Sequence, residues 1–142
     1  MAYAAIKRSP HAHARIRSVD TSAARAAPGV VAVYTGTDTD GVLNPIPCAW
    51  LVPDSDVKAV AYPAMAKDVV RYAGDAVAVV VADSREQAED ALEAINVSYQ
   101  VLPNVINPEA ATKEGAPQLH EDAPGNQAFH WVVAGGDADA AF

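Results

Sequence analysis

The stretch from Ala76 to Val101, AVAVVVADSREQAEDALEAINVSYQV, decides the fold. Its first seven residues are all apolar, which is typical of a strand buried on both faces. In such a strand the odd-numbered valines form a bulky face, and the alanines at 76, 78 and 82 form a mostly small one. The stretch therefore predicts a central strand over 76–82.

A helix is predicted directly after this strand. Ser84 is followed three residues later by Gln87, the spacing of a capping box at a helix start. Apolar residues then recur at helical spacing, at Ala88, Ala91, Leu92 and Ile95. We expect this alanine-rich stripe to lie close against the small-residue face of the preceding strand.

Apolar and polar residues alternate in the segment after the helix. Within residues 95–102 the pattern places Ile95, Val97, Tyr99 and Val101 inward and the polar residues between them outward. Residues from about 76 to 102 thus predict a strand-helix-strand unit. It is either a parallel βαβ crossover or an antiparallel return.

Upstream and downstream segments add strands and short helices. Strands are expected over 2–8 and 30–35, with a short helix between them from Asp20 or Thr21 to Ala27. Asn107 and Pro108 begin another short helix. Residues 41–63 form a long proline-rich connection whose role the pattern does not define. The whole predicts an α+β fold with a mixed sheet and short additional helices.

Composition narrows the possible partners and location. The formal net charge is −8 with a pI near 4.7, which argues against nucleic acid and anionic lipid as partners. A single cysteine excludes an internal disulfide and suits a reducing compartment. Neither a membrane-length apolar run nor a signal peptide is recognised. We expect a cytoplasmic protein.

Residues 11–17 carry the most basic feature of this acidic chain. Alternation places His11, His13, Arg15 and Arg17 on one side of a strand. Zinc sites need three or four ligands, and the arginines would repel a cation, so metal binding is disfavoured. The stripe, together with Trp50, instead predicts a contact with another subunit or domain.

For three other candidate residues the sequence favours a structural role over a chemical one. Cys48 lies in the proline-rich connection with no histidine or lysine nearby in sequence, which favours a packed or inert thiol. Lys67 follows Ala64-Met65-Ala66, which differs from the biotin-carrier pattern A-M-K-M. Gly74 precedes the central strand, whereas phosphate loops place glycine after one, so it favours a turn. No catalytic, cofactor-binding or metal-binding residue is predicted.

Five segments of the chain carry a resemblance to known proteins: RSPHAHARIRSVDTSAA (8–24), PGVVAVYTG (28–36), IPCAW (46–50), residues 66–111, and HEDAPGN (120–126). In this order they resemble the large subunits of molybdenum hydroxylases. This family includes aerobic carbon monoxide dehydrogenases, aldehyde oxidoreductases (aldehyde oxidases) and xanthine dehydrogenases. The segment IPCAW is most similar to the carbon monoxide dehydrogenase-like branch.

The resemblance implies a fold and a context. Residues 1–142 would form a single α/β hammerhead domain at the N-terminal end of a longer large subunit. The full enzyme would use molybdopterin-bound molybdenum, with iron–sulfur clusters and FAD in partner subunits or domains. The family's pterin-binding segments and catalytic glutamate lie downstream, so the resemblance transfers no catalytic residue and no cofactor ligand. The chain alone is predicted to be inactive.

Two other interpretations stay open. The chain would also suit a free-standing hammerhead adaptor or carrier module without redox chemistry. A third hypothesis is a small enzyme that uses Cys48 or the His11–His13 pair. The substrate, the oligomeric state and the native length are not defined by the pattern.

Overall fold

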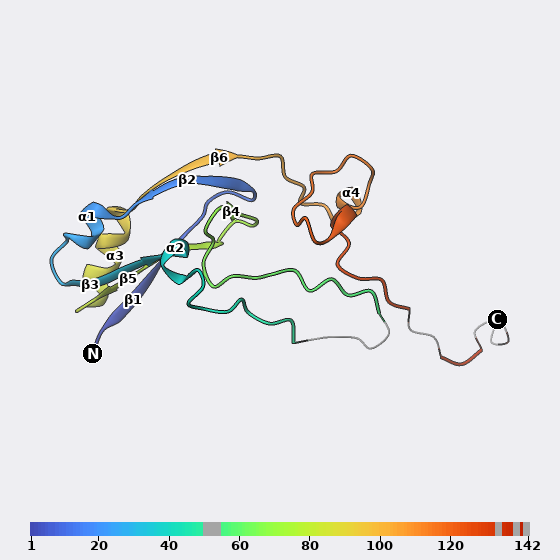
Figure 1. Cartoon of the computed structure of the whole chain (residues 1–142), viewed down its shortest axis with the longest axis horizontal. Coiled ribbons are helices and arrows are strands. Elements are labelled where there is room, and N and C mark those ends of the chain that lie inside the picture. Colours follow the sequence, from blue (N-terminus) through green and yellow to red (C-terminus); the bar gives the residue numbers. More distant parts are fainter. Residues whose placement is uncertain (50–54, 133–134, 138–139, 141–142) are drawn as a thin grey trace.

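The protein is elongated, with two small sheets toward one end and an irregular lobe around α4 toward the other (Figure 1). The computed structural model describes residues 1–49, 55–132, 135–137 and 140. The elements are β1 (Tyr3–Arg8), β2 (Ala14–Asp20), α1 (Ser22–Arg25), β3 (Val30–Thr35), α2 (Gly36–Thr39), β4 (Val69–Val70), β5 (Ala76–Ala82), α3 (Arg85–Glu93), β6 (Asn96–Val101), α4 (Pro108–Ala111) and the 3₁₀ helix η1 (Pro124–Asn126). None of the described helices is long and apolar enough to cross a membrane.

The first sheet is built around β5, as the apolar run predicts. Its strand order is β1-β5-β3, and both pairings are antiparallel. The side chains of Ala78, Val80 and Ala82 are fully buried on the face that α1 and α3 cover. Burial of these small side chains brings the helix backbone close to the sheet.

Helix α3 begins and packs as its sequence predicts. The Ser84 hydroxyl accepts a hydrogen bond from the backbone N–H of Gln87 at 3.2 Å, which satisfies one of the amides at the helix start. Ala88 and Ala91 are 1% exposed and belong to the same cluster as the small side chains of β5. The predicted helix, its N-cap and its buried face are therefore confirmed.

The second sheet corrects the expected sheet arrangement. Strand β6 does not pair with β5; the order is β4-β2-β6, again antiparallel throughout. Both edges of β5 are already occupied by β1 and β3, so the chain leaving α3 crosses to β2. The α+β class and the strand-helix-strand unit are confirmed. The expected mixed sheet is instead two antiparallel sheets, and the parallel βαβ alternative is wrong.

The second face of β5 is buried only at one end. Val77 joins a second core cluster with Ala14, Ala66 and Val70, whereas Val79 and Val81 are half-buried. The expectation of a strand buried on both faces thus holds in full only near Val77.

The other predicted elements begin or end within a few residues of the positions expected from the sequence. β6 runs past the second core, so Val101 is 61% exposed rather than inward. Helix α1 ends at Arg25, short of the expected Ala27. Helix α4 begins as expected, because the Asn107 side chain accepts a hydrogen bond from the backbone N–H of Ala110 at 2.9 Å.

Candidate partner-binding surface and polar cleft

The two histidines of the predicted basic stripe lie before β2, whereas its two arginines lie within it. The backbone N–H of His11 donates to the Ser9 hydroxyl at 3.0 Å, and β2 begins only at Ala14. Side-chain alternation applies within a strand and not within the turn before it. The expectation that all four side chains share one strand face is therefore wrong.

Both histidines have contacts inside the domain. His13 is buried, and its Nδ1 lies 2.7 Å from the carbonyl oxygen of Pro103. Because a carbonyl only accepts, this nitrogen donates. The ring of His11 meets the ring of Tyr99 edge-on, with 4.9 Å between centroids. These contacts hold the end of β6 to the turn before β2.

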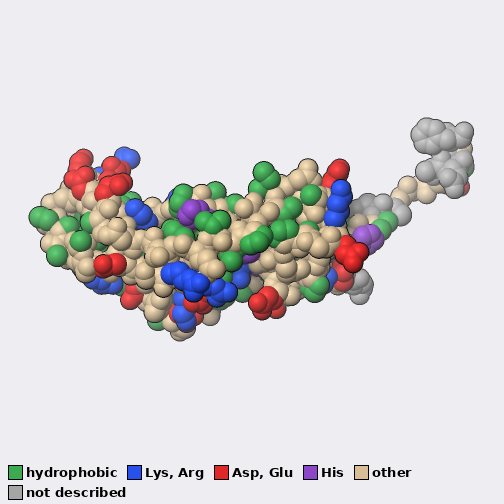
Figure 2. Space-filling view, turned by 90° about the horizontal axis from the view of Figure 1, so that it is seen from above, with side chains coloured by type: hydrophobic (Ala, Val, Ile, Leu, Met, Phe, Trp, Pro, Cys, Tyr) green, Lys and Arg blue, Asp and Glu red, His purple; other side chains and the backbone are tan. Residues whose placement is uncertain are grey.

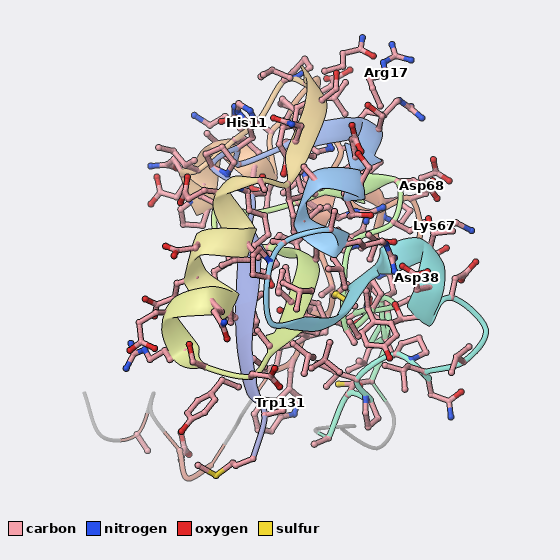
Figure 3. All side chains as sticks on the ribbon, turned by 90° about the vertical axis from the view of Figure 1, so that its left-hand side faces the viewer. His11, Arg17, Asp38, Lys67, Asp68 and Trp131 are labelled. Atoms are coloured by element: carbon pink, nitrogen blue, oxygen red, sulfur yellow. The ribbon has the colours of Figure 1, made fainter. Side chains whose placement is uncertain are left out.

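The two arginines of the stripe face solvent from β2. Arg15 and Arg17 are exposed, and the Arg17 guanidinium donates a hydrogen bond to the side-chain oxygen of Gln100 on β6. His11 and Arg17 point away from each other on either side of the two strands (Figure 3). Trp50, the remaining predicted interface residue, lies outside the described residues.

The structure also places the remaining sequence candidates, Lys67 and Cys48. The Lys67 ammonium forms an ion pair with Asp40, with 2.5 Å between Nζ and Oδ2. Cys48 is exposed on the long connection. Across the part of the chain that the structure describes, no three His, Cys, Asp or Glu side chains gather where they could hold a metal ion.

Exposed apolar side chains follow the long connection and the C-terminal segment. The two segments are joined by a backbone hydrogen bond from Lys58 to Ala128 at 2.8 Å and by one from His130 to the Asp56 carboxylate at 2.9 Å. Large apolar side chains that are at least half exposed here are Val42, Leu43, Ile46, Ile106, Trp131 and Val132. Apolar side chains are spread along much of the face in Figure 2. Such exposure is typical of a surface that contacts other protein.

A polar cleft that the sequence pattern did not predict surrounds Arg71. Its Nε donates to the carbonyl oxygen of Leu119 at 2.9 Å, and its backbone N–H donates to the Asp75 carboxylate at 3.1 Å. Arg71, Tyr72, Asp75 and His120 line a cavity of about 100 Å³. Arg71 and His120 lie far apart in sequence, and no local signal connects them.

Burial shifts the acid–base behaviour of the cleft. Partial burial, with a smaller effect of the Arg71 charge, lowers the pKa of His120. Burial likewise raises the pKa of the Asp75 carboxyl, against hydrogen bonds that lower it. A hydrogen bond with the Tyr62 hydroxyl is the main cause that raises the pKa of Tyr72. At neutral pH the cleft therefore holds a neutral imidazole beside a permanent positive charge.

The His120 pKa predicts a pH dependence of stability. Below its unfolded pKa of 6.5 the unfolded state binds more protons at this residue than the folded state does, so the free energy of unfolding falls as the pH falls. We expect His120→Gln to reduce this loss between pH 7.5 and 5, as measured by urea midpoints. An equal slope in wild type and variant would contradict the prediction.

Comparison with known proteins identifies the domain. The family described as aldehyde oxidase and xanthine dehydrogenase, a/b hammerhead domain, matches residues 1–103. The chain belongs to this family. The resemblance drawn from the sequence is thus confirmed, and so is the hammerhead fold class.

Three proteins similar to this chain are much longer than it is. The chain is 43% identical over 116 residues to the carbon monoxide dehydrogenase large chain of Afipia carboxidovorans, covering 81% of this chain and 13% of that one. It is 37% identical over 142 residues to the nicotinate dehydrogenase large molybdopterin subunit of Eubacterium barkeri, covering 100% and 31%. The crystal structure of quinoline 2-oxidoreductase from Pseudomonas putida 86 superposes with a TM-score of 0.77 at 42% identity, covering 83% and 15%. The chain thus spans less than a third of the length of each.

Proposed function

We propose that this hammerhead domain is a non-catalytic, N-terminal part of the molybdopterin-binding large subunit of a molybdenum-dependent hydroxylase. The family match over residues 1–103 carries the proposal. The relatives that this chain matches are several times longer than it is, as expected if the chain is one part of a large subunit. The full enzyme would be a cytoplasmic oxidoreductase of the carbon monoxide dehydrogenase or aldehyde/xanthine dehydrogenase type. Residues 1–142 would form one domain of it.

The described residues at the start of α3 do not suit the anionic phosphate of the molybdenum cofactor. The turn from β5 to α3 carries no glycine, and its Ser84 side chain already accepts from the Gln87 amide, one of those that an anion would use. The described ranges also hold no His, Cys, Asp or Glu cluster suited to a metal. We therefore assign molybdopterin to downstream domains of the same subunit, and iron–sulfur clusters and FAD to partner subunits or domains.

The size and metal content of the native protein test this proposal. An antibody against the 142-residue chain should detect, in cell extract, a protein several times larger than 14.8 kDa. Molybdenum measured by mass spectrometry should co-purify with it. A 14.8 kDa protein that purifies without molybdenum would instead support the alternative, a free-standing hammerhead adaptor or carrier module.

The arginines of β2 are the part of the basic stripe that we propose for a domain or subunit contact. Both Arg15 and Arg17 are exposed on a protein of net charge −8, so they would attract an acidic partner surface. We expect the double variant Arg15→Glu, Arg17→Glu to weaken assembly of the native enzyme at least tenfold, measured by co-purification of its partner subunits.

Arg85→Glu is the matched control for this variant. Arg85 is also exposed, but it lies on α3 and pairs with Glu89. Assembly should survive this change. Unimpaired assembly of the double variant would remove Arg15 and Arg17 from the interface.

A further inference from the structure

We propose that the cleft around Arg71 and His120 binds a carboxylate group. The group would belong to an acidic side chain of another polypeptide segment or to a small carboxylic acid, since both present the same planar, singly charged oxygen pair. The proposal does not depend on the function of the full enzyme.

The guanidinium of Arg71 is held in place by a carbonyl oxygen and, among the described residues, forms no salt bridge, although its charge acts on the nearby Asp75 carboxyl. Its Nε bond to the Leu119 carbonyl leaves the terminal amino groups for other acceptors. Arg71 lines three cavities, of about 100, 260 and 420 Å³. The ion pairs among the described residues use Arg25, Lys58, Lys67 and Arg85, and none includes Arg71.

The other walls of the smallest cavity suit a bound carboxylate. His120 offers a neutral imidazole that donates one hydrogen bond, and the hydroxyls of Tyr62 and Tyr72 share a hydrogen bond on the same lining. Ala61, Pro63 and Val69 supply apolar surface. Apolar surroundings strengthen a charge-assisted hydrogen bond between arginine and a carboxylate.

Acidic neighbours restrict the charge of the ligand. Asp40, Glu121 and Asp122 line the adjoining 420 Å³ cavity, and Asp75 lies at the floor of the site beside the Arg71 backbone. A doubly charged phosphate would meet more repulsion from these groups than a carboxylate would. The planar fork of arginine also matches a carboxylate with two parallel hydrogen bonds.

Side-chain NMR of the 142-residue chain tests the proposal. Three probes would be titrated separately: benzoate, N-acetylglutamate N-methylamide and inorganic phosphate. We expect saturable shifts of the Arg71 Nε–H and His120 ring resonances with at least one carboxylate, and at least tenfold weaker shifts with phosphate. Tighter binding of the glutamate derivative would assign the site to a polypeptide side chain, and tighter binding of benzoate would assign it to a small acid.

Two variants test whether carboxylate binding needs the planar guanidinium group of Arg71 or only a positive charge at that position. Arg71→Lys keeps the charge but loses the planar fork, so carboxylate binding should weaken at least tenfold, whereas Arg85→Lys on α3 should bind as wild type. Because Arg71 also holds Leu119, His120→Gln provides a second variant that leaves that bond intact, with an expected loss of about threefold or more. The absence of saturable shifts with both carboxylates, equal binding of phosphate, or unchanged binding in both Arg71→Lys and His120→Gln would each overturn the proposal.

Discussion

Replacing Ala91 with leucine should lower the free energy of unfolding by about 1–3 kcal/mol. Ala91 is 1% exposed, in the cluster where α3 packs on the small side chains of β5. Three additional carbon atoms have no space there unless the helix moves away from Ala78 and Ala82. Movement of α3 would also disturb Ile95, which is buried in the same cluster and leads directly into β6.

A leucine on the exposed side of α3 controls for the presence of leucine in the helix. Asp90 is the neighbouring residue and is exposed, so Asp90→Leu places the same side chain in solvent. This control should change stability by less than about 0.5 kcal/mol. Both variants would be compared with wild type by urea denaturation. If Ala91→Leu leaves the urea midpoint unchanged, the assigned packing face of α3 is wrong.

Replacing Gly36 with alanine should cost about 2 kcal/mol or more, because the backbone of a neighbouring loop fills the space that a side chain would need. A methyl group on Gly36 would lie 2.6 Å from the carbonyl carbon of Ala66 and 2.8 Å from the Cα of Lys67, and would overlap the Ala66 oxygen. Ala66 cannot easily retreat, since its backbone N–H donates to the Ala76 carbonyl at 2.7 Å at the start of β5.

Gly135→Ala provides the matched control for Gly36→Ala. Among the described residues no heavy atom lies within 4 Å of the position that its methyl group would take, and its backbone is not left-handed. We expect the urea midpoint of this control to match wild type. A neutral Gly36→Ala would show that residues 66–67 do not hold α2 against the sheets.

The prediction of α3 and β5 from sequence succeeded because local features specify both elements. Seven consecutive apolar residues fill a central strand, and the Ser84 cap with alanines at helical spacing fixes where α3 begins and which face it buries. The family was recognised from the order of several segments, most of which lie within the matched residues 1–103. No comparable local pattern specifies the basic stripe, where the strand begins only at Ala14, after both histidines.

The sequence by itself determined β1, β3, β5, β6, α3 and the family of the chain, because those properties depend on side-chain order over a few turns or strands. Only the tertiary structure decided that β6 pairs with β2, since the edges of β5 were already taken by β1 and β3. It also brought Arg71 and His120 into one cleft. Both results depend on contacts between residues far apart in the chain, and no periodicity along the sequence encodes such contacts.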